Sequence, residues 1–213
     1  MRLPEHIAVI PDGNRRWAES RGMSKEKGYR PGLAPGIVLF KLCQEAGIKE
    51  ITFYGFTTDN TKRPPKQRRA FTQACIEAVE ILSKEDAALL VIGNSDSPMF
   101  PAALLPFRTR QVFGRGGMKV NFLVNYGWEW DLNHIKGGGP GKKNVLNHVK
   151  SSDISMVDLI IRWGGRRRLS GFLPVQSIYA DFYVIDDYWP DFKPDHFFQA
   201  LKWYNEQEIT LGG

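Results

Sequence analysis

Residues 9–17 read VIPDGNRRW, and this stretch indicates how the chain folds. It completes a short apolar run, residues 6–10, that stops at Pro11. A carboxylate (Asp12), a glycine, an amide and two arginines follow at once. An apolar run that gives way abruptly to a polar cluster is typical of a buried strand that delivers functional side chains at its carboxyl end.

Five further apolar runs share this character, at residues 51–56, 89–92, 120–124, 157–163 and 182–185. They do not alternate cleanly between apolar and polar residues, so both faces of each strand are expected to be buried. Segments with helix-like spacing separate them, at residues 37–46, 68–83 and 102–112. This order predicts an α/β fold in one domain over residues 1–213, with a central, mostly parallel sheet of about six strands flanked by helices.

The composition is that of an ordinary globular protein, with 213 residues, 42% apolar residues and a net charge of +6. The positive surplus fits either simple solubility or an anionic partner such as a phosphorylated ligand, nucleic acid or an acidic membrane face. Cys43 and Cys75 stand outside any zinc-binding spacing and are expected to be core thiols. Neither a signal pattern nor a stretch of about 20 apolar residues is visible, so a cytoplasmic protein is expected.

The glycine-rich segment GGGPGKK, residues 137–143, resembles a P-loop only superficially. A P-loop needs a glycine five residues before the Gly-Lys pair and a serine or threonine after it. Lys136 and Lys143 occupy those places. We therefore expect a mobile surface loop.

Two more polar clusters follow predicted strands. Residues 56–65, FTTDNTKRPP, offer hydroxyls, an amide and cations, although a polar turn would explain them equally well. Residues 160–172, IIRWGGRRRLSGF, include Arg162 at the end of an apolar run. A solvated basic run would explain Arg166 to Arg168, but a buried Arg162 needs an anion beside it.

All three clusters lie at the carboxyl side of predicted strands, so they are expected to meet in one crevice. Several cations and hydroxyls with few acids would suit a polyanion, most naturally a diphosphate. Asp12, with Asp181 later in the chain, would hold a Mg²⁺ that neutralises this diphosphate.

Taken together, the motifs resemble the signatures of the cis-prenyltransferases, the undecaprenyl diphosphate synthase-like family. They are HIAVIPDGNRRWA (6–18), FYGFTTDNTKRP (53–64) and DLIIRWGGRRRLSGFLPVQSIYADFYVIDDYWPDF (158–192), in the family's order and across nearly the whole chain. The resemblance implies an Mg²⁺-dependent enzyme that joins an allylic isoprenyl diphosphate to isopentenyl diphosphate by cis-addition and releases diphosphate. It also implies an apolar substrate crevice, with walls from residues 37–46 and 71–82.

The resemblance assigns roles by position. Asp12 and Arg16 would assist ionisation of the allylic diphosphate, and Asn60 would assist proton removal. Asp12 and Asp181 would hold the Mg²⁺. The diphosphate would be wrapped by Gly13, Asn14, Arg15 and Arg16 with Trp17 beside them, and isopentenyl diphosphate would be held by Arg162, Arg168 and Ser170. The other expected substrate contacts are Lys25, Tyr29, Thr57, Thr58, Asp59, Arg63 and Leu169.

Several positions depart from the family's usual pattern. Arg15 replaces a glycine, Lys25 an arginine, Tyr29 a histidine, Thr61 an aromatic residue and Arg166 an acid. Because related synthases that couple two dimethylallyl units at a branched carbon also carry a substituted first signature, irregular head-to-middle coupling is an alternative. A non-catalytic subunit of a heteromeric enzyme is another, although such subunits typically lose the aspartate that stands here as Asp12.

The family also suggests how the chain would assemble. A homodimer formed through the C-terminal half is expected, with aromatic segments 182–192 and 197–204 either at the interface or in the core. A peripheral membrane contact for product delivery is a further expectation, which would place the protein in the cytoplasm at the membrane surface. We expect no nucleic-acid partner.

Overall fold

The computed structural model describes residues 2–133, 135 and 142–208. Its strands form a seven-stranded sheet in the order β4-β3-β5-β2-β1-β6-β7. The strands are β1 (His6–Ile10), β2 (Glu50–Tyr54), β3 (Ala87–Ile92), β4 (Gln111–Phe113), β5 (Met118–Leu123), β6 (Leu159–Arg162) and β7 (Asp181–Val184). Every pairing is parallel except that of β3 with β4. The predicted α/β fold with a mostly parallel sheet is therefore confirmed.

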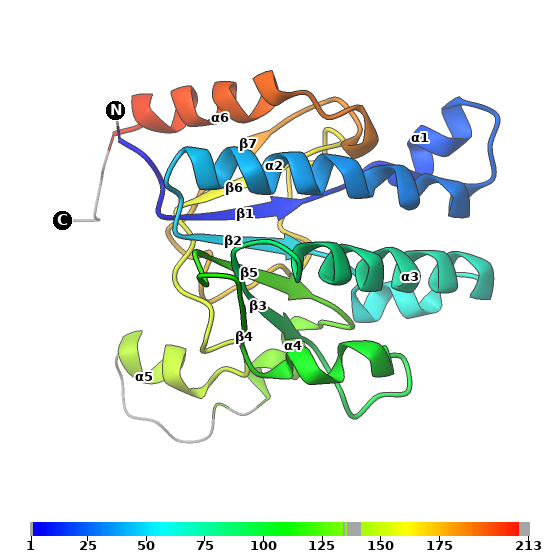
Figure 1. Cartoon of the computed structure of the whole chain (residues 1–213), viewed down its shortest axis with the longest axis horizontal. Coiled ribbons are helices and arrows are strands. Elements are labelled where there is room, and N and C mark those ends of the chain that lie inside the picture. Colours follow the sequence, from blue (N-terminus) through cyan, green and yellow to red (C-terminus); the bar gives the residue numbers. More distant parts are fainter. Residues whose placement is uncertain (1, 134, 136–141, 209–213) are drawn as a thin grey trace.

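Helices flank this sheet on both sides of its central strands (Figure 1). The α-helices are α1 (Asn14–Ser20), α2 (Leu33–Glu45), α3 (Pro65–Leu82), α4 (Trp128–Leu132), α5 (Lys142–His148) and α6 (Pro194–Glu206). Five 3₁₀-helices join them in the described residues: η1 (Lys25–Gly28), η2 (Arg30–Gly32), η3 (Thr58–Lys62), η4 (Ala102–Arg108) and η5 (Trp189–Asp191).

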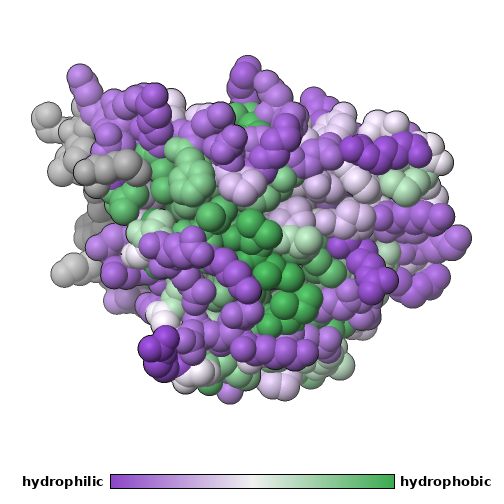
Figure 2. All heavy atoms as spheres, turned by 45° about the horizontal axis from the view of Figure 1, so that its top comes forward, coloured by the Kyte–Doolittle hydropathy of each residue, from purple (hydrophilic) through white to green (hydrophobic). Residues whose placement is uncertain are grey.

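The larger core lies under α2, α3 and α6, which pack side by side against one face of the sheet. In α3, Pro65 suits the first helical position, and Ala74, Cys75, Val79 and Leu82 recur at helical spacing, so one stripe of the helix is buried. Helix α2 is apolar almost all round, with Leu39 buried and Val38 exposed. Figure 2 shows apolar atoms gathered in the middle of this side of the molecule, bordered by hydrophilic ones.

The segment 102–112, predicted as a helix, is corrected by the structure. It forms the 3₁₀-helix η4 followed by the edge strand β4. Pro106 lies inside η4, where it removes a backbone donor and prevents a regular α-helix. Val112 then pairs with Ala88 in antiparallel register, which accounts for a strand beyond the six that were predicted.

Other predictions have mixed outcomes. Cys43 and Cys75 are free and buried, as predicted, and burial raises the pKa of the Cys75 thiol to about 12. Phe197 and Tyr204 of α6 fill the core rather than face outward. The predicted loop at 137–143 lies largely outside the described residues. Across the described part of the chain, no helix is both long and apolar enough to cross a bilayer.

A buried polar network ties β1, β2 and β5 together on the opposite face. His6 Nε2 lies 2.8 Å from Thr52 Oγ1, and Asn121 Nδ2 donates to Thr52 Oγ1 (2.9 Å) and to Glu50 Oε1 (2.7 Å). The Ser155 hydroxyl also donates to Glu50. Because the four side chains from β1, β2 and β5 are shut away from water, each depends on its partners for its hydrogen bonds.

This network should make stability depend on pH. Burial lowers the pKa of His6 below its ordinary 6.5, against the opposing pull of Glu50. The unfolded chain therefore takes up this proton first, and the free energy of unfolding should fall as the pH drops through about 6.5. The pKa of Glu50 is also lowered, so Glu50 stays ionised in this window. Urea denaturation at about pH 7.5 and about pH 5.5 measures the effect. The loss should shrink in His6→Asn, and an equal loss in both proteins would contradict the assignment.

Candidate active site

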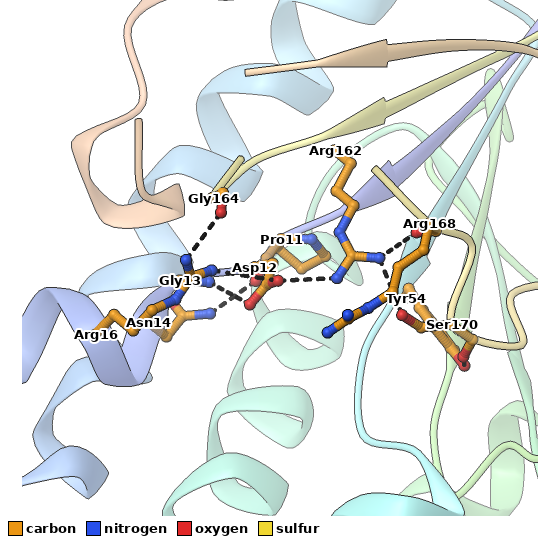
Figure 3. A network of polar contacts seen from close by, with 10 residues as sticks. All are labelled: Pro11, Asp12, Gly13, Asn14, Arg16, Tyr54, Arg162, Gly164, Arg168 and Ser170. Atoms are coloured by element: carbon orange, nitrogen blue, oxygen red, sulfur yellow. Dashed lines mark hydrogen bonds and ion pairs between the residues drawn. The ribbon is translucent and has the colours of Figure 1, made fainter. Parts of the chain in front are cut away.

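Asp12 is the centre of a polar cluster at the carboxyl end of β1. Its Oδ2 lies 2.9 Å from Arg162 Nη2 and 3.4 Å from Arg16 Nη2, and its Oδ1 accepts the backbone N–H of Gly13 at 2.6 Å. In Figure 3 the two guanidiniums approach the carboxylate from opposite sides, one from α1 and one from the end of β6. Burial alone would raise the pKa of Asp12, but the hydrogen bond from Arg162 and the charge of Arg16 outweigh it and hold that pKa below its usual range. Asp12 is therefore ionised at neutral pH.

Arg162 supplies the buried cation of this cluster and is only 4% exposed. Besides Asp12 it contacts Ser170, with Nη1 3.0 Å from Oγ, and the backbone oxygen of Arg168. Its Nε is buried without a hydrogen-bond partner. The sequence required an anion beside this residue, and the structure supplies Asp12 from 150 positions earlier in the chain.

Gly13 connects β1 to α1 in a left-handed backbone conformation that favours glycine. Its φ is +102°, and an added Cβ would lie 2.7 Å from Cδ1 of Tyr188. Gly22 has φ +67° but open space around it. Gly13 is thus fixed by a close approach of two chain segments as well as by its φ.

We expect Gly13→Ala to destabilise the protein more than Gly22→Ala. Both substitutions strain a left-handed backbone, at about 1 kcal/mol or more each, but only the first also drives a methyl group into Tyr188. Chemical denaturation of the two variants measures the difference. Equal losses would mean that Tyr188 moves aside freely.

The second cluster lies across from Asp12, around η3. Arg63 Nη1 donates to the Tyr29 hydroxyl at 3.0 Å, and the Tyr29 ring stacks on Phe71 with centroids 4.6 Å apart. Burial and the nearby charge of Arg15 lower the pKa of Arg63, with Tyr29 opposing. Asn60 holds the turn together, since its Oδ1 accepts the Thr57 N–H at 3.1 Å.

These clusters line one cavity of about 420 Å³. Seven basic side chains line it against three acidic ones, so the cavity is strongly positive. The predicted site residues on its wall are Asp12, Gly13, Asn14, Arg15, Arg16, Lys25, Tyr29, Thr57, Asp59, Asn60, Arg63, Arg162, Arg168 and Ser170. Sequence reasoning did not assign Glu19 or Tyr54 to this wall, because Glu19 follows the first motif and Tyr54, although in the second motif, belongs to an apolar run.

Four predicted site residues lie elsewhere. Trp17 turns away, with its Nε1 donating to Asp191 Oδ1 at 2.8 Å. Thr58 packs beside Gly127, and Leu169 is exposed outside the cavity wall. Asp181 begins β7 in register with Leu159 and Ile7, while Asp12 lies beyond the other end of β1. At ~3.3 Å per residue, Asp181 is thus roughly 15 Å further back along the sheet than Asp12, beside Arg2, and one chain does not bring the two carboxylates together.

The described residues hold no preformed metal cage, since no group of three or more His, Cys, Asp or Glu side chains is suitably arranged among them. Asp12 is an ionised carboxylate on the cavity wall, placed between the guanidiniums of Arg16 and Arg162. Mg²⁺ is commonly held by one or two carboxylates together with substrate phosphates. Asp12 fits that mode and not a cage built from protein alone.

An apolar crevice of about 80 Å³ opens directly from the polar cavity. The two spaces share Pro11, Asn14, Tyr29, Gly55 and Phe71. Beyond them the crevice runs between α2, α3 and the sheet, where Ile37, Ala74, Ala78, Leu82 and Phe122 are among its lining residues. Residues 71–82 supply this lining as predicted, whereas of 37–46 only Ile37 is among the lining residues, next to Leu33 and Gly36 of the same helix.

Comparison with known proteins places this arrangement in a family. The profile of the family described as putative undecaprenyl diphosphate synthase matches residues 10–212. The chain belongs to this family. The cis-prenyltransferase resemblance read from the three motifs is thereby confirmed.

Full-length relatives support the same membership. An isoprenyl transferase of Leptospira interrogans is 34% identical, covering 99% of this chain and 95% of the relative. A ditrans,polycis-undecaprenyl-diphosphate synthase of Vibrio parahaemolyticus, named as specific for (2E,6E)-farnesyl diphosphate, is 29% identical over 99% of this chain and 91% of its own. The crystal structure of lavandulyl diphosphate synthase from Lavandula x intermedia, in complex with dimethylallyl diphosphate, matches with a TM-score of 0.86 over 99% of both chains. At 22% identity it supports the fold.

Proposed function

We propose that this cis-prenyltransferase family member condenses an allylic isoprenyl diphosphate with isopentenyl diphosphate by cis-addition and releases diphosphate. One observation carries the proposal: a cavity lined by seven cations opens directly into an apolar crevice. That junction suits an amphiphile with a polyanionic head and a hydrocarbon tail. Relatives named isoprenyl transferase and undecaprenyl-diphosphate synthase support the same reaction class.

The donor's diphosphate would lie against Arg15, Arg16 and Arg63. Breaking the allylic C–O bond leaves negative charge on the departing diphosphate and positive charge on the carbon. Guanidiniums already in place stabilise the first charge, with little reorganisation during the reaction. The apolar crevice would hold the carbon chain and keep water away from the cation.

Asp12 would hold Mg²⁺ together with oxygens of the donor diphosphate. When bound, the ion would add positive charge that helps to neutralise the departing diphosphate. Asp12 suits this role because it is ionised at neutral pH. The proposal leaves Asp181 without a part in the site of its own chain. That residue lies at the amino end of β7, whereas the cavity lies at the carboxyl ends of the strands.

The acceptor's diphosphate would lie against Arg162, Arg168 and Ser170, at the facing side of the cavity. A new C–C bond then forms between the allylic carbon and the acceptor's double bond, and one proton leaves the acceptor. Asn60 would assist that proton loss by orienting the reacting groups. Two anion-binding clusters in one cavity would hold donor and acceptor within reach of each other.

Product analysis tests this function. The purified full-length protein is incubated with Mg²⁺ and dimethylallyl, geranyl or farnesyl diphosphate, with and without isopentenyl diphosphate, and products are identified by mass and NMR. Products that require isopentenyl diphosphate and carry cis double bonds are expected. A branched product from allylic substrate alone would replace regular addition by irregular coupling. No product from any pair would support a non-catalytic subunit instead.

We also propose a homodimer formed through the C-terminal half. Strand β7 ends the sheet, and the segment just before it exposes Ile178 (66%) and Tyr179 (59%). Burying such side chains against a second copy would be favourable. Light scattering coupled to size exclusion measures the mass, and Ile178→Asp should shift it toward the monomer. A cytoplasmic location with a peripheral membrane contact, and the lack of a nucleic-acid partner, stay predictions of the sequence.

A further inference from the structure

The size of the apolar crevice limits what the proposed reaction can accept. A donor whose diphosphate occupies the polar cavity must place its hydrocarbon past Tyr29 and Phe71, where the two spaces join. Asn14 and Gly55 line the same junction. The volume beyond that junction therefore decides how many carbons are buried when the donor binds.

That volume is small. The crevice measures about 80 Å³. For comparison, an engineered protein cavity of ~150 Å³ lined by apolar side chains holds one benzene molecule. The crevice thus has about half the volume of that benzene-binding cavity, so a hydrocarbon tail longer than one five-carbon unit does not fit in it.

Well-packed residues line the crevice. Phe53 and Phe122 of the sheet stack with centroids 5.3 Å apart, and Leu82 lines the crevice from the last turn of α3. Fully buried Val79 and Val120 belong to the same core. Close-packed interiors resist insertion of further methylenes, at about 1–3 kcal/mol each time side chains are forced off their rotamers.

We infer that the allylic donor of this enzyme carries a single five-carbon unit, and that Leu82 and Phe122 set this limit. The inference rests on the proposed function and names its donor. A ten- or fifteen-carbon donor would have to leave most of its chain in water or displace the packed residues that line the crevice. Neither cost falls on a five-carbon donor.

The comparison of donors tests the inference. With the wild-type protein, Mg²⁺ and isopentenyl diphosphate, kcat/KM should be about tenfold or more higher for dimethylallyl diphosphate than for farnesyl diphosphate. An equal or higher value for farnesyl diphosphate would overturn the inference while leaving prenyl transfer intact. Absence of turnover with every donor would overturn the proposed function, and the inference with it.

A matched pair of leucines tests whether Leu82 limits the length of the donor. Leu82 and Leu90 are both buried, but only Leu82 lines the crevice, since Leu90 packs on the opposite face of the sheet. Leu82→Ala should raise the ratio of geranyl to dimethylallyl turnover about tenfold, and Leu90→Ala should leave it unchanged. An unchanged ratio in a folded Leu82→Ala protein, or equal shifts in both, would overturn the assignment.

A second variant covers the case in which Leu82→Ala fails to fold. Ala78 lines the crevice from α3 and is only partly buried. Ala78→Leu fills part of the crevice and leaves no cavity, so it should raise the KM for dimethylallyl diphosphate about tenfold. The KM for isopentenyl diphosphate should stay the same. An unchanged KM for the donor would count against the crevice as its binding place.

Discussion

Asp12→Asn is expected to lower kcat on the order of 10³-fold, the largest effect on turnover of any single substitution proposed for this chain. The change keeps the shape of the side chain but removes the negative charge that Arg16 and Arg162 hold in place. Without that charge, the residue would no longer hold Mg²⁺ beside the departing diphosphate. Steady-state kinetics at saturating substrates measures the loss.

Asp86→Asn is the matched control for this substitution. Asp86 also pairs with an arginine, with its Oδ2 3.0 Å from Arg115 Nη2, but it is not on the wall of the polar cavity. The control should keep nearly full activity. If Asp12→Asn turned over as well as Asp86→Asn, Asp12 would have no part in the reaction and the assignment of the site would fall.

The second large effect concerns stability and is asymmetric between the partners of the Asp12–Arg162 pair. The side chain of Arg162 is 5% exposed and that of Asp12 is 32% exposed. Asp12→Ala leaves a buried cation without a counter-charge, at a cost of about 3–5 kcal/mol. Arg162→Met leaves a carboxylate that still faces water and Arg16, so it should cost less. Urea denaturation of both variants measures the difference.

The double variant Asp12→Ala, Arg162→Met sharpens this test. Removing the buried cation should restore much of the stability lost in Asp12→Ala, while activity stays lost. Arg162→Met alone should lower kcat/KM for isopentenyl diphosphate by about 10²-fold, because a cation of the proposed acceptor site is gone. Arg167→Met is the control, since Arg167 lies in the same cluster, residues 160–172, but does not line the cavity. Additive losses of stability in the double variant would show that the two residues are not coupled.

The sequence by itself determined the fold class and the position of the three polar clusters. Apolar runs that end in polar motifs read as buried parallel strands, and the carboxyl ends of parallel strands share one edge of the sheet. This reasoning brought Asp12, Arg63 and Arg168 to one cavity without any knowledge of side-chain contacts. It also required an anion beside Arg162, because a buried guanidinium is costly alone.

Tertiary structure decided which of these side chains face the cavity and how large the crevice is. Trp17 lies in the first motif yet contacts Asp191. Asp181 lies in the third motif yet is at the amino end of its strand, away from the cavity. The pairing of Asp12 with Arg162 joins residues 150 positions apart. Such outcomes depend on the relative placement of distant segments, which local hydrophobic periodicity does not encode. The crevice volume is likewise set by how α2, α3 and the sheet pack together, and no single motif contains it.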